Sequence, residues 1–386
     1  MINKESLFRL ILVLISIFIA LIIAEAGCRL LLVNEHQYSV SATGNQYEFY
    51  QFDPKLGWSN TPGASGVYRR REFAYRITIN EHGMRQHQVA KKKESSTFRI
   101  AVLGDSFVWG IGVNDEDRLT ELLEEMLPNV EVLNFGTSGY SPVQYLLMID
   151  DIIEFEPDMV VIVFCLDNDF DDNVFYQRYG YYKPYASLDR DGSLIINGYP
   201  LPDVRKFGFQ KKNQFLGSVL LGELWNKYLV SNLDQEGLIG FSDKLLHIKN
   251  KKLSSEQKYL KSEALRINES VLAKIQSTLH EKGIPLIISS APSKREYNKD
   301  GKYGHQGYYP LVERELQRST TKLGIAFIPN VNNLNGNDFW VNDGHWNPSG
   351  HKKMAASIAS YITDREFLLV NKTLQGVKTS SIELER

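Results

Sequence analysis

Five short, largely apolar runs in this chain are each followed closely by glycine or small polar residues. Apolar runs of this length are typical of strands buried on both faces, as in a parallel sheet. Segments of helical length with one apolar face lie between them, so the pattern predicts an α/β fold with a parallel sheet of about five strands. The runs are residues 100–103, 130–133, 159–164, 284–288 and 325–328.

Ser106 follows the first run through Gly104 and Asp105, at the strand end where open α/β sheets place their ligands. A serine hydroxyl becomes a nucleophile only when an imidazole takes its proton and an acceptor fixes that imidazole. Asp343 and His345, separated by one glycine in a predicted loop, supply both groups. Ser106 also suits a helix N-cap, and that alternative stays open.

Four short blocks resemble those of the SGNH (GDSL-type) hydrolase family, in the family's order. They are Gly104-Asp105-Ser106, Asn134-Phe135-Gly136, Asn168-Asp169 and Asp343-Gly344-His345. The resemblance covers about residues 97–365 and implies a flavodoxin-like three-layer α/β/α sandwich that hydrolyses esters or transfers acyl groups. It also implies a triad of Ser106, Asp343 and His345. The implied oxyanion hole consists of the Ser106 N–H, the Gly136 N–H and the Asn168 side chain.

Two positions depart from the family's usual pattern. Leu166 stands where the third block normally has glycine, and the aspartate of the fourth block lies two residues before its histidine instead of three. The shorter spacing also occurs in branches of the family that resemble polysaccharide acetyltransferases and esterases. An α/β-hydrolase is a poorer match, because its Gly-x-Ser-x-Gly motif needs glycine where this chain has Val108.

The N-terminal segment is strongly apolar. Residues 10–24 contain one serine and no other polar residue. This apolar run is shorter than the roughly 20 residues needed to span a bilayer. We expect residues 1–33 to form one transmembrane helix, a signal anchor; a cleaved signal peptide is the alternative. Lys4 and Arg9 precede the apolar run, which predicts a single-pass membrane protein with its catalytic domain on the periplasmic or extracellular face.

The remaining chain divides by composition. Residues 34–97 are polar, aromatic and turn-rich, and we expect a β-containing lead-in region there. The predicted hydrolase-like domain covers residues 98–365. Residues 170–250 do not fit a simple strand–helix step, so we expect an insertion that forms a lid. Residues 366–386 form a polar tail.

Composition excludes some partners and sites. The net charge of −2 offers no basic face for nucleic acid. Cys28 and Cys165 lie in separate apolar segments, and we expect no disulfide between them. The acidic stretch that begins at Asp167 fails as a calcium loop, because Asp172 and Arg178 occupy the positions that need glycine and glutamate. We expect no metal and no cofactor.

The expected function combines these observations. A membrane-tethered, outward-facing domain with 11% aromatic residues suits an envelope or exported glycan. We therefore predict a serine esterase that removes O-acyl groups, most simply O-acetyl groups, from an acylated carbohydrate. An O-acyltransferase acting on a polysaccharide hydroxyl is the first alternative, because both reactions share one acyl-enzyme. A non-catalytic glycan-binding envelope protein is the second, and the intact triad argues against it.

Overall fold

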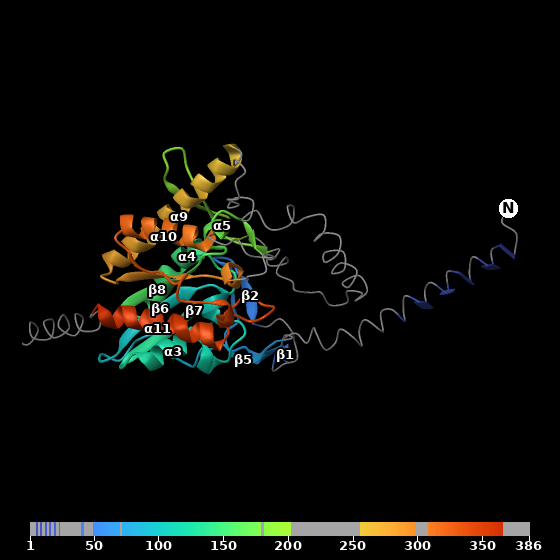
Figure 1. Ribbon diagram of the computed structural model, residues 1–386, viewed down its shortest axis with the longest axis horizontal. Coiled ribbons are helices and arrows are strands. Elements are labelled where there is room, and N and C mark those ends of the chain that lie inside the picture. Colours follow the sequence, from blue (N-terminus) through green and yellow to red (C-terminus); the bar gives the residue numbers. More distant parts are fainter. Residues whose placement is uncertain are drawn as a thin grey trace, which may run out of the picture.

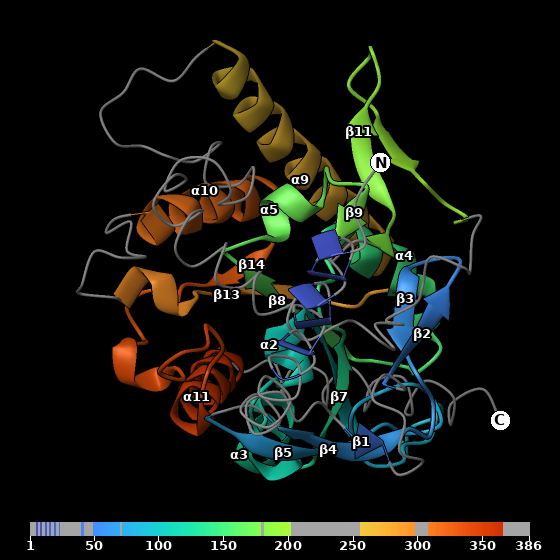
Figure 2. The ribbon, with the colours of Figure 1, turned by 90° about the vertical axis from the view of Figure 1, so that its right-hand side faces the viewer.

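The computed structural model describes residues 49–69, 72–178, 181–201, 255–297 and 308–365, and a few isolated positions before residue 49. Its centre is a five-stranded parallel sheet in the order β14-β13-β8-β6-β7 (Figure 2). The predicted α/β class and the five parallel strands are confirmed. The strands are β6 (Phe98–Gly104), β7 (Val130–Gly136), β8 (Met159–Cys165), β13 (Leu286–Ala291) and β14 (Ala326–Ile328).

Helices cover both faces of this sheet, so the domain has three layers (Figure 1). Because side chains alternate along a strand, Ala101 and Leu103 of β6 pack on one face while Ile100 and Val102 pack on the other. The first face lies against α4 (Pro142–Ile153), α9 (Ser255–Glu281) and α10 (Tyr308–Lys322). The second lies against α3 (Leu119–Met126) and α11 (Pro348–Asp364).

The lead-in region consists of short antiparallel strands and turns packed against the main sheet. It contains β2 (Tyr50–Asp53) paired with β3 (Gly57–Asn60), and β4 (Ser65–Arg69) paired with β5 (Ala74–Thr78) and with β1 (Val40–Ser41). After β5, Gln86 pairs with the edge strand β7: its Oε1 accepts the Asn134 N–H at 2.5 Å. The lead-in thereby covers a sheet edge that would otherwise expose unpaired backbone groups.

The region expected to form a lid is described only in part, because residues 202–254 lie outside the described residues. Its described part contains the helical turn α5 (Asp169–Asp172) and two small hairpins, one of which packs on α9. The hairpins pair β9 (Gln177–Arg178) with β10 (Tyr181–Tyr182), and β11 (Tyr185–Leu188) with β12 (Leu194–Asn197). The lid therefore stays a prediction, and the tail at 366–386 lies outside the described residues.

The predicted membrane anchor is also described at scattered positions. Those between residues 5 and 23 are helical, and their large apolar side chains are exposed, Phe8 by 61% and Ile23 by 66%. Within the described part of the chain, no helix combines the length and hydropathy that crossing a membrane requires. The anchor remains a prediction.

Candidate active site

Ser106 lies at a sharp turn between β6 and a short helix, α2 (Ser106–Trp109). Asp105 caps this helix, since its Oδ1 accepts the Phe107 N–H at 3.0 Å. The turn requires glycine at 104, because a Cβ there would lie 2.3 Å from Cγ2 of Val108. Asp105, and not Ser106, is therefore the N-cap of this helix. The Ser106 hydroxyl faces the loop that carries His345.

The three predicted triad residues meet at this turn, although 239 positions separate Ser106 from His345. Nε2 of His345 lies 2.8 Å from the Ser106 Oγ, and Nδ1 lies 2.5 Å from Oδ1 of Asp343. A carboxylate beside Nδ1 holds the imidazole proton there and leaves the Nε2 lone pair directed at the serine hydroxyl. The arrangement can withdraw the hydroxyl proton as Ser106 attacks an electrophile.

The loop that carries His345 is fixed on several sides. The Trp340 N–H donates to the His345 carbonyl at 3.2 Å, and Lys294 Nζ donates to the Trp340 carbonyl at 2.7 Å. The Phe107 ring packs against the imidazole with 5.1 Å between centroids. The side chains of Asp343 and His345 are 9% and 24% exposed, so solvent reaches the imidazole more readily than the carboxylate.

Gly136 does not play the expected part in the oxyanion hole. Its N–H already donates to Oδ1 of Asn134 at 2.9 Å, so it is not available to a developing negative charge. Glycine is needed here for another reason: a Cβ would lie 2.4 Å from the Trp109 nitrogen. The expectation that Gly136 donates to the oxyanion is therefore wrong, and its role is to let β7 approach α2 closely.

The turn after β7 offers two other donors. The N–H groups of Thr137 and Tyr140 bond to carbonyls of Gly104 and Thr137, at 3.1 and 3.2 Å. Those of Ser138 and Gly139 make no hydrogen bond to another residue of the described chain. Gly139 has a φ of 77°, a left-handed conformation that glycine adopts without strain. The Ser138-Gly139 pair lies just beyond the Asn134-Phe135-Gly136 block and is the sequence signal for these donors, which the block itself does not contain.

Asn168 follows β8, the strand next to β6 in the sheet, and precedes α5. Its Nδ2 donates to Oδ2 of Asp172 at 2.7 Å, and Asp172 forms an ion pair with Arg178 at 2.7 Å. An asparagine amide carries two N–H groups, so one is held by Asp172 and the other remains for a second acceptor. Its side chain makes no capping bond to α5, so a helix-capping role does not explain the residue.

Two buried carboxyl groups lie close to the nucleophile turn. Burial raises the pKa of Asp105, partly offset by the Phe107 N–H and His345. Burial, and then the neighbouring Asp105, raise the pKa of Asp169 well above its usual range. Burial also raises the pKa of the Cys165 thiol, which makes it a poor nucleophile.

His351 is the histidine nearest in sequence to the candidate base, and it lies buried in α11. Its Nδ1 accepts the Leu119 N–H at 3.2 Å, so the ring is a neutral acceptor. Burial, followed by the nearby Arg85, lowers the pKa of His351 to about 3. His351 therefore ties α11 to α3 and does not compete with His345.

Comparison with known proteins finds only solved structures of low sequence identity to this chain. No protein-family model matches the chain, and no curated protein matches it. A G-D-S-L family lipolytic protein from Desulfitobacterium hafniense is 11% identical, with 68% of this chain and 98% of that chain covered and a TM-score of 0.35. A second, from Veillonella parvula, is 14% identical, with coverages of 69% and 99% and a TM-score of 0.37.

An acetyl xylan esterase is 13% identical, with 69% of this chain and 100% of that chain covered and a TM-score of 0.36. Similarity this low carries no conclusion about the function of the present chain. What its site can do follows from the geometry of Ser106, His345 and Asp343 alone.

Proposed function

We propose that this protein is a serine ester hydrolase that acts on O-acyl groups of an envelope or exported glycan. The observation that carries the proposal is the unbroken hydrogen-bond chain from Ser106 through His345 to Asp343. A neutral imidazole between a hydroxyl and a carboxylate is an arrangement suited to acyl transfer through a covalent intermediate.

In the proposed reaction, His345 Nε2 takes the Ser106 proton while Oγ attacks the ester carbonyl carbon. The tetrahedral oxyanion accepts hydrogen bonds from the Ser106 N–H, the free Asn168 amide N–H and a donor in the Ser138–Gly139 turn. His345 then protonates the departing alkoxide, which leaves an acyl-enzyme on Ser106. Water, deprotonated by His345, attacks the acyl carbon and releases the acid and the free serine.

An exposed aromatic pair supports a glycan substrate. Tyr176 and Tyr182 stack with 6.0 Å between ring centroids, and their side chains are 55% and 39% exposed. They belong to the segment that directly follows α5, close in sequence to Asn168. Aromatic rings that present a face to solvent are suited to pack against the apolar face of a sugar ring.

We expect a fluorophosphonate probe to label the full chain once, at Ser106, because its phosphorus mimics the attacked carbonyl carbon. Fluoride is displaced as Oγ bonds to phosphorus, and peptide mapping locates the adduct. We also expect acetate release from p-nitrophenyl acetate and from an O-acetylated polysaccharide. A chain that is neither labelled nor active on any of these esters is not a serine hydrolase.

We also propose that the N-terminal segment holds the protein in a membrane. The exposed apolar side chains of the helical positions between residues 5 and 23, with Lys4 and Arg9 beside them, support this. The full chain is expected to sediment with membranes and to be released by detergent but not by high salt. Release by salt alone would indicate an electrostatic association and rule out an inserted helix.

A further inference from the structure

We infer that Asn60, a residue of the lead-in region, positions the nucleophile relative to the oxyanion donors. This inference rests on the proposed ester hydrolysis. Asn60 ends β3 and is 5% exposed. Its Oδ1 accepts the Trp109 Nε1–H at 3.0 Å, and its Nδ2 donates to the carbonyls of Gly83 at 2.9 Å and Gly136 at 3.3 Å.

These contacts join α2, which carries the nucleophile, to the turn that carries the proposed oxyanion donors. Trp109 is the last residue of α2, whose first residue is Ser106. Gly136 is the last residue of β7 and leads into the Ser138–Gly139 turn. One amide therefore holds the end of the nucleophile helix and the start of the donor turn. A misplacement of about 1 Å between such groups can slow a reaction about 10²-fold.

Two other side chains of the lead-in also contact the Ser138–Gly139 turn. The neighbouring Trp58 donates from Nε1 to the Ser138 carbonyl at 2.9 Å, and the Tyr50 hydroxyl donates to Ser138 Oγ at 2.9 Å. The lead-in thus contacts the donor turn through three side chains from β2 and β3. None of the three belongs to the four blocks that resemble the hydrolase family.

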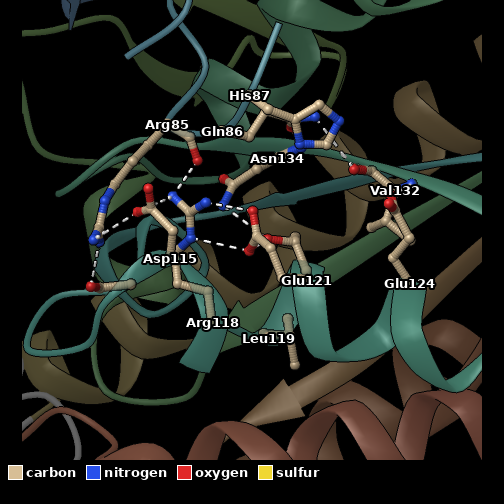
Figure 3. A network of polar contacts seen from close by, with 12 residues as sticks. Arg85, Gln86, His87, Asp115, Arg118, Leu119, Glu121, Glu124, Val132 and Asn134 are labelled. Carbon is tan, nitrogen blue, oxygen red and sulfur yellow. Dashed lines mark hydrogen bonds and ion pairs between the residues drawn. The ribbon is translucent and has the colours of Figure 1, made fainter. Parts of the chain in front are cut away.

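A second lead-in contact holds the same C-terminal end of α2 through its backbone. The buried Arg85 guanidinium donates to the carbonyls of Trp109 at 3.0 Å and Gly110 at 2.5 Å. Figure 3 shows Arg85 beside Asp115 and Arg118, and Gln86 reaching Asn134. Arg85 holds the backbone at the end of α2, while the Asn60 side chain contacts both α2 and the end of β7.

The chemistry of the amide explains why asparagine stands here. Asn60 must accept from an indole N–H and donate to two carbonyls at once, and an amide does both. In an Asn60→Asp variant the carboxylate can still accept from Trp109, but it faces the Gly83 and Gly136 carbonyls without a hydrogen to offer. In Asn60→Ala both links are lost.

The test compares Asn60→Ala and Asn60→Asp with a matched control, Asn80→Ala. Asn80 is another buried lead-in asparagine, 1% exposed, whose side chain bonds only within the lead-in, to His82, Met84 and His87. We expect both Asn60 variants to lose about 10- to 100-fold in kcat and in the rate of fluorophosphonate labelling at Ser106, with little change in KM. Asn80→Ala is expected to lower Tm but to keep kcat.

A double-mutant cycle with Trp109→Phe separates positioning from general stability. If Asn60 acts through Trp109, the loss in kcat in the double variant is smaller than the product of the two single losses. Asn60 variants that keep the wild-type labelling rate, or that lose it only in proportion to Asn80→Ala, overturn the inference. A wild-type chain that is not labelled at Ser106 removes the proposed hydrolase function itself, which is a distinct result.

Discussion

Replacing Ser106 with alanine, or His345 with alanine, is expected to lower kcat for ester hydrolysis by about 10⁶-fold. Ser106 supplies the nucleophile that forms the acyl-enzyme in the proposed mechanism, and the His345 Nε2, 2.8 Å from the Ser106 hydroxyl, takes its proton. The measurement is turnover of p-nitrophenyl acetate by each variant, with Tm as the check on folding. Neither change removes a buried apolar group, so we expect Tm to stay close to that of the wild type.

The double variant distinguishes a cooperating pair from two independent contributions. Because serine and histidine act in one step, the double variant should be about as inactive as either single variant. Ser360→Ala in α11 and His280→Ala in α9 change the same residue types at exposed positions and serve as controls. Retained turnover in Ser106→Ala would place the nucleophile elsewhere and remove the mechanism.

The sheet could be predicted because it depends on local patterns, whereas the meeting of the triad residues was predicted from the chemistry that a serine nucleophile needs and from the resemblance to the SGNH blocks. An uninterrupted apolar run such as 159–164 reports burial on both faces wherever it lies in a chain. Parallel strands bring their carboxyl ends to one edge, so residues that follow different strands come together without any knowledge of the loops. Ser106 and Asn168 follow adjacent strands for this reason.

The oxyanion donors could not be assigned correctly because that choice depends on side-chain detail. Gly136 follows a strand as a donor should, but the Asn134 side chain folds back and takes its N–H. A close approach of α2 explains the glycine at this position, and no pattern along the sequence reports that approach.

The contacts that the lead-in region makes with the candidate site could not be predicted from the sequence for a related reason. Asn60 and Arg85 are residue types that normally lie in turns or on surfaces, and here both are buried. Their partners lie far away in the chain: Trp109 is 49 positions from Asn60 and 24 from Arg85. Only the packing of the β-containing region on the main sheet brings these groups together.

Replacing Asp343 with asparagine is expected to lower kcat by about 10⁴-fold while the fold is kept. Oδ1 of Asp343 accepts hydrogen bonds from both the backbone N–H and Nδ1 of His345, at 3.0 and 2.5 Å. An asparagine that turns its amide N–H toward Nδ1 makes that nitrogen an acceptor and moves the imidazole proton to Nε2. The nitrogen that should take the Ser106 proton is then already protonated.

The position of the proton gives this prediction a readout besides turnover. Nitrogen NMR of labelled histidine should show the neutral His345 ring protonated at Nδ1 in the wild type and at Nε2 in Asp343→Asn. Fluorophosphonate labelling of Ser106 should slow by a similar factor to kcat, because the same proton transfer limits both. Asn342→Ala, a change at the exposed neighbouring residue, is the matched control and should keep both rates.

Two results would count against the role assigned to Asp343. If Asp343→Asn kept its turnover, the short contact to Nδ1 would only stabilise the loop, and another group would have to orient the imidazole. If the proton stayed at Nδ1 while activity fell, the loss would come from the missing negative charge beside the imidazolium. Asp343→Ala completes the comparison, because it removes the charge without presenting an N–H to Nδ1. Turnover higher in Asp343→Ala than in Asp343→Asn is the expected order if the tautomer is the main cause.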